Sequence, residues 1–94
     1  MIRFFTLFIS LFIFNFSYAQ EKEFDIAVDY YNQKQYNVAQ LIFENIDSDI
    51  ALLYNAKCSK NLGSEDAIEL FSRLLNDFPF SIYHNEVYSL LAEI

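Results

Sequence analysis

Few side chains in this sequence are of types that do chemistry. His84 is the only histidine, and a general base or metal ligand would need a nucleophile or further ligands at a defined spacing, which the sequence does not supply. Glu65, Asp66 and Glu69 form an acidic cluster of the kind that paired-carboxylate catalysis uses. At the start of a helix such residues more commonly complement the helix dipole. We therefore expect His84 on a helix surface, and no catalytic, cofactor-binding or metal-binding residues.

The composition excludes several classes of protein. With one Cys, one His and one Gly, this 94-residue chain cannot build a zinc finger, a disulfide framework or a glycine-rich phosphate loop. The formal net charge is -7, from six Lys and Arg against thirteen Asp and Glu, which leaves no basic patch for nucleic acid. The length allows one small domain.

Residues 1–19 have the pattern of a signal peptide. Arg3 supplies the positive charge, residues 4–16 are predominantly apolar, and Ser17 and Ala19 are the small residues that signal peptidase requires. An uncleaved membrane anchor is the alternative, but the apolar stretch is shorter than the roughly 20 residues that a spanning helix needs. The pattern predicts export to the periplasm or the extracellular space.

The predicted mature chain, residues 20–94, has the spacing of short helices. One Gly and one Pro offer too little turn chemistry for a β-sheet. Apolar residues instead recur at intervals of three and four from Phe24 onward. The expected stripes are Phe24, Ala27, Val28 and Tyr31; Tyr36, Ala39, Phe43 and Ile46; Leu52, Leu53 and Ala56; Ile68, Phe71, Leu75 and Phe78, with Ala67, Leu70 and Leu74 beside them; and Tyr83, Val87, Leu90, Leu91 and Ile94.

Helix-breaking and capping residues separate these stripes. The polar residues 32–35 and 47–49 interrupt the pattern, and the side-chain oxygens of 47–49 suit a helix N-cap. Gly63 is suited to end the third helix, and Pro79 to end the fourth, while Ser64 and Ser81 can cap the helices that follow. Five short helices joined by short loops must pack as antiparallel hairpins. The sequence predicts an all-α fold.

The two hairpins share a motif that resembles the tetratricopeptide repeat family. This family has helix-turn-helix units with small and aromatic residues at fixed positions and a closing proline. The matching residues are Ala27, Tyr30, Tyr36, Ala39 and Phe43 in the first unit, and Ala56, Leu62, Gly63, Ala67, Phe71 and Pro79 in the second. Lys34 departs from the pattern, because the family usually has glycine there. The resemblance implies a solenoid of two repeats and the first helix of a third over residues 20–94.

The segment from Leu74 to Tyr83 is similar to repeat junctions of bacterial envelope proteins. Together with the expected export signal, it most resembles the N-terminal part of long exported repeat proteins of the Bacteroidota. Relatives in the repeat family often carry cysteine at the position of Cys58, which favours a buried thiol. An intermolecular disulfide is the alternative in an exported chain.

The resemblance implies a binding function without catalysis. In such repeats the first helix of each unit lines a concave surface that holds a peptide or protein segment. The implied partner-binding residues are Phe24, Val28, Tyr31, Asn32, Leu53, Lys57, Lys60 and Asn61. The alternative is a purely structural piece of a longer solenoid, whose fifth helix packs on further repeats or on a second copy of the chain.

Overall fold

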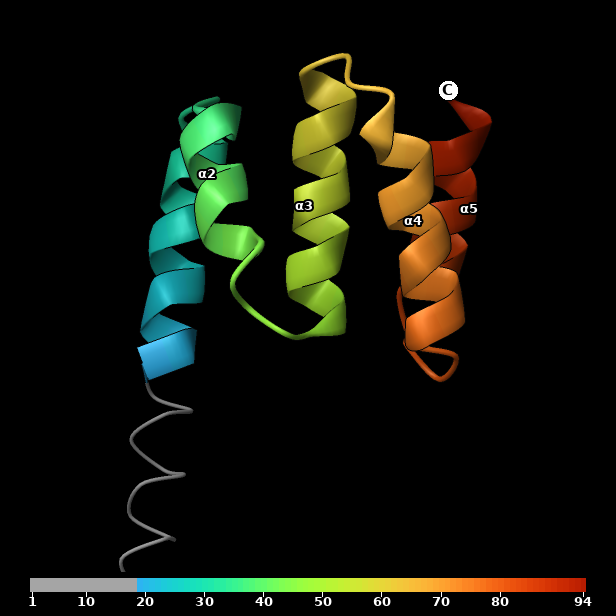
Figure 1. Ribbon diagram of the computed structural model, residues 1–94, viewed down its shortest axis with the longest axis horizontal. Helices are drawn as coiled ribbons and strands as arrows, with labels where there is room; N and C mark the ends of the chain where they lie inside the picture. Colours follow the sequence, from blue (N-terminus) through green and yellow to red (C-terminus); the bar gives the residue numbers. More distant parts are fainter. Residues whose placement is uncertain (1–18) are drawn as a thin grey trace, which may run out of the picture.

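The computed structural model describes residues 19–94, which form five helices and no strand (Figure 1). The first helix covers residues 19–32. The other helices are α2 (Tyr36–Phe43), α3 (Asp49–Asn61), α4 (Asp66–Asp77) and α5 (His84–Ala92). The predicted all-α class is confirmed for this part of the chain. Residues 1–18, which hold most of the expected signal peptide, lie outside the described residues, so export stays a prediction.

Local chemistry sets several helix boundaries where the sequence places them. The Ser48 hydroxyl accepts a hydrogen bond from the Ala51 N–H at 3.1 Å and caps α3, as expected for the 47–49 segment. Gly63 has φ of +71°, the left-handed backbone that glycine adopts without strain, and follows the end of α3. Phe78 is the C-cap of α4, directly before Pro79.

Other boundaries differ from the sequence-based expectation. The first helix begins before Phe24. Helix α2 ends at Phe43, so Ile46, which we expected on its apolar stripe, is buried but lies in the turn after the helix. Helix α5 begins at His84 rather than directly after Ser81. The Ser81 hydroxyl accepts from the Tyr83 N–H at 3.2 Å, so it caps the turn before the helix.

Lys34 has φ of 63°, a left-handed conformation that costs a residue with a side chain about 1 to 2 kcal/mol. Lys34→Gly should remove this strain. Glycine also gives the unfolded chain more conformational freedom, which lowers stability by about 0.4 to 1 kcal/mol. Because the relieved strain is larger, the melting temperature should rise by a few degrees. Lys22→Gly, the same exchange inside the first helix, should lower it, because glycine disfavours a helix by about 1 kcal/mol. Thermal unfolding by circular dichroism measures both, and shifts of the same sign would contradict the prediction.

Consecutive helices run antiparallel, with α3 in the middle (Figure 1). Helix α3 packs against α2 on one side and α4 on the other, and α4 packs against α5. Two apolar clusters result, one on each side of α3. Four alanines in these clusters are almost fully buried, as expected for sites of close helix approach: Ala27, Ala39, Ala56 and Ala67. Their small side chains let neighbouring helices approach closely.

The buried stripe of α4 is rotated from the one that the sequence predicts. Ile68, which we expected on the stripe, is exposed, and Leu75 is only half-buried. The buried residues of α4 are Phe71, which was expected on the stripe, and Ala67, Leu70 and Leu74, which were expected beside it. The rotation arises because α4 packs against both α3 and α5 and buries the sector between them.

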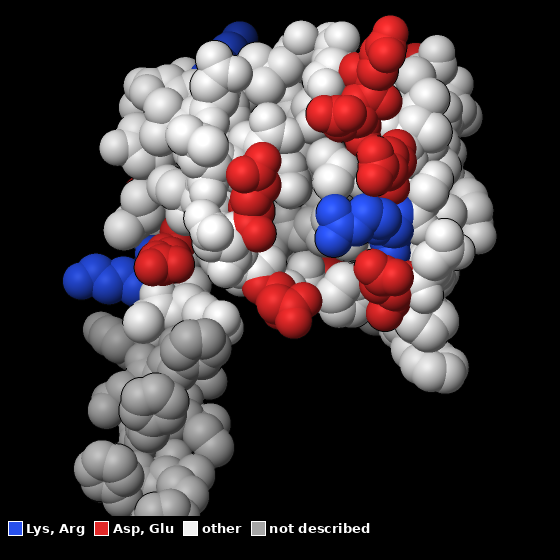
Figure 2. Space-filling model, viewed as in Figure 1, with Lys and Arg blue, Asp and Glu red and all other residues white. Residues whose placement is uncertain are grey.

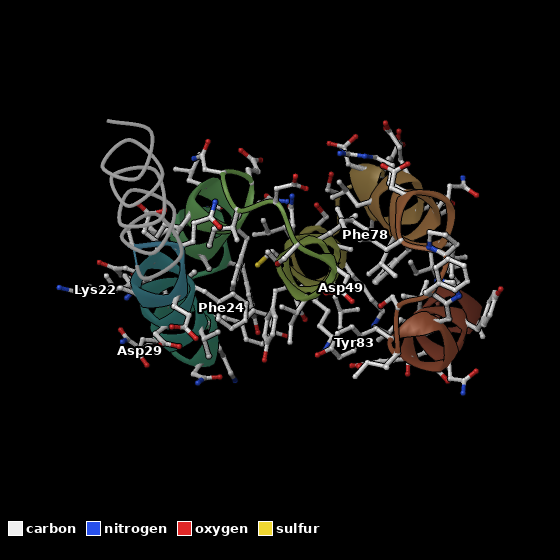
Figure 3. The ribbon with its side chains drawn as sticks, turned by 90° about the horizontal axis from the view of Figure 1, so that it is seen from below. Lys22, Phe24, Asp29, Asp49, Phe78 and Tyr83 are labelled. Carbon is white, nitrogen blue, oxygen red and sulfur yellow. The ribbon has the colours of Figure 1, made fainter. Side chains whose placement is uncertain are left out.

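Seen along the helices, α3 separates two sides of the molecule (Figure 3). Helices α2 and α4 flank α3 on one side, and the first helix and α5 flank it on the other. Helix α3 therefore presents different residues to each side.

Candidate functional site

The eight residues expected to bind a partner come from the first helix and α3. Phe24, Val28 and Tyr31 are half-buried on the first helix, where Asn32 is exposed at the C-terminal end. On α3, Lys57 and Lys60 are half-buried and Asn61 is exposed. We call the surface formed by Phe24, Val28, Tyr31, Asn32, Tyr54, Lys57, Lys60 and Asn61 the aromatic face.

Tyr54 is the centre of the aromatic face. Its ring meets that of Phe24 edge to face at 5.7 Å and that of Tyr31 at 5.1 Å, and it stacks on Phe43 at 5.1 Å between centroids. Such pairs add about 0.5 to 1.5 kcal/mol each beyond their buried area. The cluster fixes α3 against the first hairpin and leaves Tyr54 and Tyr31 partly accessible.

Lys57 gives the aromatic face a positive charge. Its ammonium lies 5.1 Å from the centroid of the Tyr54 ring, a cation–π distance. Burial raises the pKa of Tyr31, while the charge of Lys57 and a hydrogen bond with Asn61 oppose that shift. Tyr31 therefore keeps its proton at neutral pH and can donate a hydrogen bond to a bound group.

Both lysines of the aromatic face are paired with α5 and its C-cap. Lys57 lies 2.6 Å from a carboxylate oxygen of Glu86, and Lys60 lies 2.8 Å from one of Glu93. These pairs are half-exposed, so each is worth at most about 1 kcal/mol. They tie α5 to α3, and a bound carboxylate would have to compete with Glu86 and Glu93.

Leu53 differs from the other seven expected residues. Its side chain is 2% exposed and packs in the core with Ala56 and Leu70. It has almost no surface to offer a partner, because the helix turns it toward α4. We therefore leave Leu53 out of the aromatic face.

Sequence reasoning missed Tyr54. The signal was present, because Tyr54 precedes Lys57 by three residues and Asn61 by seven, which places all three on one side of a helix. Its contacts with the first hairpin depend on how α3 crosses that hairpin, and the spacing does not reveal this.

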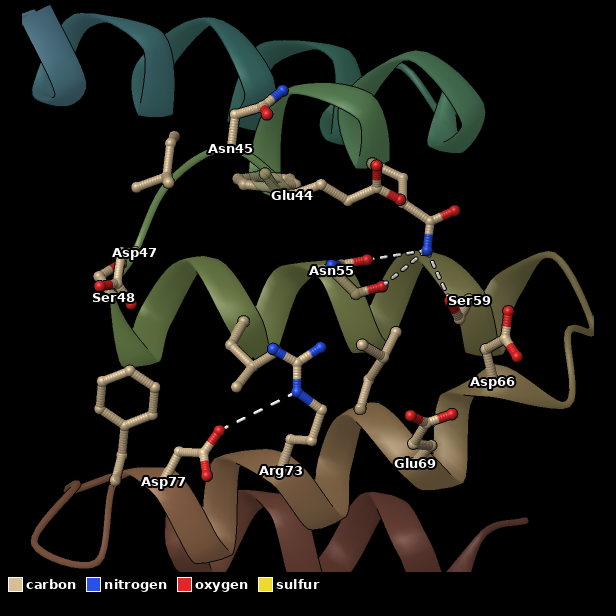
Figure 4. A pocket seen from close by; sticks show the side chains of 16 residues that line it. Glu44, Asn45, Asp47, Ser48, Asn55, Ser59, Asp66, Glu69, Arg73 and Asp77 are labelled. Atoms are coloured by element: carbon tan, nitrogen blue, oxygen red, sulfur yellow. Dashed lines mark hydrogen bonds and ion pairs between the residues drawn. The ribbon is translucent and has the colours of Figure 1, made fainter.

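The opposite side of α3 forms the floor of a groove of about 930 Å³ between α2 and α4 (Figure 4). The polar residues on its floor are Ser48, Asn55 and Ser59. Five carboxylates and one guanidinium line it: Glu44, Asp47, Asp66, Glu69, Asp77 and Arg73. We call this site the acidic groove. Figure 2 shows acidic side chains following α4, with one basic group among them.

A hydrogen-bond network connects α2 to the floor of the acidic groove. The Gln40 Nε2 donates to Asn55 Oδ1 at 2.8 Å and to Ser59 Oγ at 2.6 Å (Figure 4). Asn55 and Ser59 are both buried, so these bonds satisfy polar atoms that would otherwise destabilise the fold.

The acidic cluster that the sequence singled out divides in the structure. Asp66 and Glu69 lie in the first turn of α4 and line the acidic groove, whereas Glu65 precedes the helix and does not line it. Arg73 is 4.0 Å from Asp77, one turn further along α4. Asp66 and Glu69 are placed to stabilise the positive end of the α4 dipole.

His84 has a structural contact in the turn between α4 and α5. Its Nε2 donates to the carbonyl oxygen of Phe78 at 2.7 Å, and the side chain is half-buried. The Ser81 hydroxyl donates to Asp49 Oδ2 at 2.8 Å and ties the same turn to the start of α3. Within residues 19–94 no group of three or more His, Cys, Asp or Glu residues is arranged to hold a metal ion.

The Cys58 thiol is buried, as expected, and burial raises its pKa from 9.0 to about 11. It should therefore react with thiol reagents at pH 8 much more slowly in the folded chain than in urea. As the pH rises above 9, the thiol ionises first in the unfolded chain, so its contribution to stability is lost between about pH 9 and pH 11. Comparing the unfolding free energies of the wild type and Cys58→Ala across that range isolates this loss, and a constant difference would contradict it.

Comparisons with protein-family models, with curated proteins and with solved structures find no match to this chain. None of the helices between residues 19 and 94 has the length and hydrophobicity needed to cross a membrane.

Proposed function

We propose that the chain is a non-enzymatic binding module, and that its aromatic face binds a peptide or protein segment. The observation that carries this proposal is the partly accessible pair of Tyr31 and Tyr54, with Lys57 over the Tyr54 ring. Aromatic rings offer large contact areas at low entropic cost and are enriched in protein interfaces. At the helix ends, the exposed carboxamide of Asn32 can hydrogen-bond the backbone of a bound segment. The Asn61 Oδ1 can accept a further bond, while its Nδ2 donates to the Lys57 carbonyl at 2.9 Å.

The order of the helices supports a tetratricopeptide-like solenoid as the scaffold. Each hairpin pairs a helix that contributes to the aromatic face with a helix that forms a wall of the acidic groove: the first helix with α2, and α3 with α4. Helix α5 continues the series, since the lysines of α3 bridge to it. In such an array the first helices of successive units form a continuous surface, which suits the recognition of an extended segment.

The test compares two matched pairs of asparagines. Peptides are first selected from a random twelve-residue library on the immobilised chain, and their affinities are measured by fluorescence anisotropy. The double variant Asn32→Ala/Asn61→Ala should weaken binding about tenfold or more, the result of losing two hydrogen bonds of roughly 1 kcal/mol each. Asn76→Ala/Asn85→Ala removes two exposed carboxamides from other surfaces and should change little. Equal losses in both, or no saturable binder, would refute the proposal.

A second candidate function is structural. Exposed apolar side chains occur on α4, on α5 and just after α5: Ile68, Tyr88 and Ile94. Two of them, Ile68 and Ile94, line a hollow of about 470 Å³. Such a surface fits a further helix or a second copy of the chain. Sedimentation at high concentration tests it: self-association that a polar Ile94→Lys substitution abolishes supports this role, and a monomer argues against it.

Export to the cell envelope is part of the proposed function. The pattern of residues 1–19 supports cleavage before Gln20, which would release residues 20–94. Mass spectrometry of the protein from its native host should find Gln20 at the N-terminus. Intact Met1 in the membrane fraction would favour the anchored alternative.

A further inference from the structure

The acidic groove lies on the side of α3 away from the aromatic face and has a strongly negative lining. Five of the thirteen acidic residues of the chain lie on it, against a single basic residue, Arg73. The cation does not neutralise the groove, because its only carboxylate contact in residues 19–94 is Asp77 at 4.0 Å, and both side chains are more than half exposed. The potential in a concave site of one sign is focused by its walls and attracts ligands of the opposite sign.

The acidic side chains are arranged along the groove rather than at one point. Asp66, Glu69, Arg73 and Asp77 are separated by three, four and four residues, so they form one stripe along α4. From Asp66 to Asp77 a helix rises about 16 Å, at about 1.5 Å per residue. Glu44 and Asp47 face this stripe from the α2 side. A small cation would use one of these groups, whereas a polypeptide in extended form can reach several.

The floor of the acidic groove offers a free hydrogen-bond donor. Asn55 is 6% exposed, and its Oδ1 accepts from Gln40, but its Nδ2 has no partner among residues 19–94. Every fully buried side-chain nitrogen and oxygen of this part of the chain has a partner, so the Nδ2 atom of Asn55 opens to the groove. An accessible amide donor on the floor between two acidic walls is complementary to a peptide carbonyl flanked by basic side chains.

We propose that the acidic groove binds an extended polypeptide segment with lysine or arginine at alternate positions. Alternate side chains of an extended chain lie about 6.6 Å apart on the same face, so basic residues at every second position point to one wall and can pair in turn with Asp66, Glu69 and Asp77 of α4. The Asn55 amide donates to a backbone carbonyl of the segment. This proposal does not depend on the function of the aromatic face, because the two surfaces lie on opposite sides of α3.

The binding test uses the full 94-residue chain in a non-ionic detergent. The probe is a fluorescein-labelled twelve-residue peptide of alternating lysine and serine, and the control peptide has glutamate in place of lysine. Fluorescence anisotropy should show saturable binding of the lysine peptide that weakens as NaCl is raised, and no binding of the glutamate peptide. Equal binding of both peptides, or a salt-independent affinity, would overturn the proposal.

Charge variants separate the acidic groove from the general negative charge of the chain. Asp66→Asn/Glu69→Gln should lower the affinity roughly fivefold to tenfold, whereas Asp25→Asn/Asp29→Asn removes the same charge from exposed sites on the first helix and should change it less than about twofold. Arg73→Gln should raise the affinity. All five substituted positions are exposed, so folding is kept. Equal losses in the two double variants, or a loss with Arg73→Gln, would show attraction to the whole surface and contradict a binding groove.

Asn55 is tested separately because its substitution also affects packing. Asn55→Ala should weaken the lysine peptide in proportion to one lost hydrogen bond, about threefold to tenfold, and leave the salt dependence unchanged. The charge variants should instead reduce the salt dependence. If Asn55→Ala alters only the salt dependence, the amide does not contact the peptide and the proposed binding mode is wrong.

Discussion

Phe71→Ala should lower the free energy of unfolding by about 3 to 5 kcal/mol. Phe71 is 0% exposed and lies in the core cluster that joins α3, α4 and α5. Truncation removes most of its buried area and leaves a cavity that the surrounding helices fill only partly. A domain of this size holds about 5 to 15 kcal/mol in total, so the variant should be largely unfolded near body temperature. Urea denaturation followed by circular dichroism measures the loss.

Phe80→Ala is the matched control for Phe71→Ala. Phe80 is 96% exposed in the turn between α4 and α5, so its truncation removes no core contact. The expected change is within about 0.5 kcal/mol. Similar losses for the two variants would mean that Phe71 is not in the core.

Ala67→Leu should destabilise the chain by about 1 to 3 kcal/mol or more through overpacking. Ala67 is 2% exposed at the start of α4, in the same cluster as Leu53 and Ala56 of α3. Three additional carbon atoms have no space there, so α4 must move away from α3 or the new side chain must adopt a strained rotamer. Thermal unfolding should shift downward by roughly 4 to 8 °C for each kcal/mol lost.

Asn76→Leu controls for the intrinsic effect of leucine in α4. Asn76 is exposed on the same helix, and leucine is a good helix former. Its melting temperature should stay close to that of the wild type. Equal melting temperatures for Ala67→Leu and Asn76→Leu would refute the close helix approach at Ala67.

The helix breaks were predictable because they depend on local chemistry. Ser48, Gly63 and Pro79 act through their own backbone preferences or through hydrogen bonds within a few residues. The start of α5 was predicted less well, because the Ser81 hydroxyl also serves a distant partner, Asp49 of α3. Sequence spacing contains no information on such a contact.

The two proposed binding surfaces were predictable only in part. The aromatic face followed from a family resemblance, yet Tyr54 at its centre was missed and Leu53 was misplaced, because both depend on the rotation of α3 against its neighbours. The acidic groove was not foreseen. Its walls come from α2 and α4, two helices that are not consecutive, and only the packing of both against α3 brings them to one site.

The most direct test of the binding proposal is a map of where a selected peptide binds. Amide chemical shifts of the ¹⁵N-labelled chain are recorded during titration with a peptide selected from the random library. We expect the largest shifts on the aromatic face, at Tyr31, Asn32, Tyr54, Lys57 and Asn61, while Ile68 and Asn76 of α4 stay unchanged. Shifts confined to α4 and α5, with none at Tyr31 or Tyr54, would contradict it.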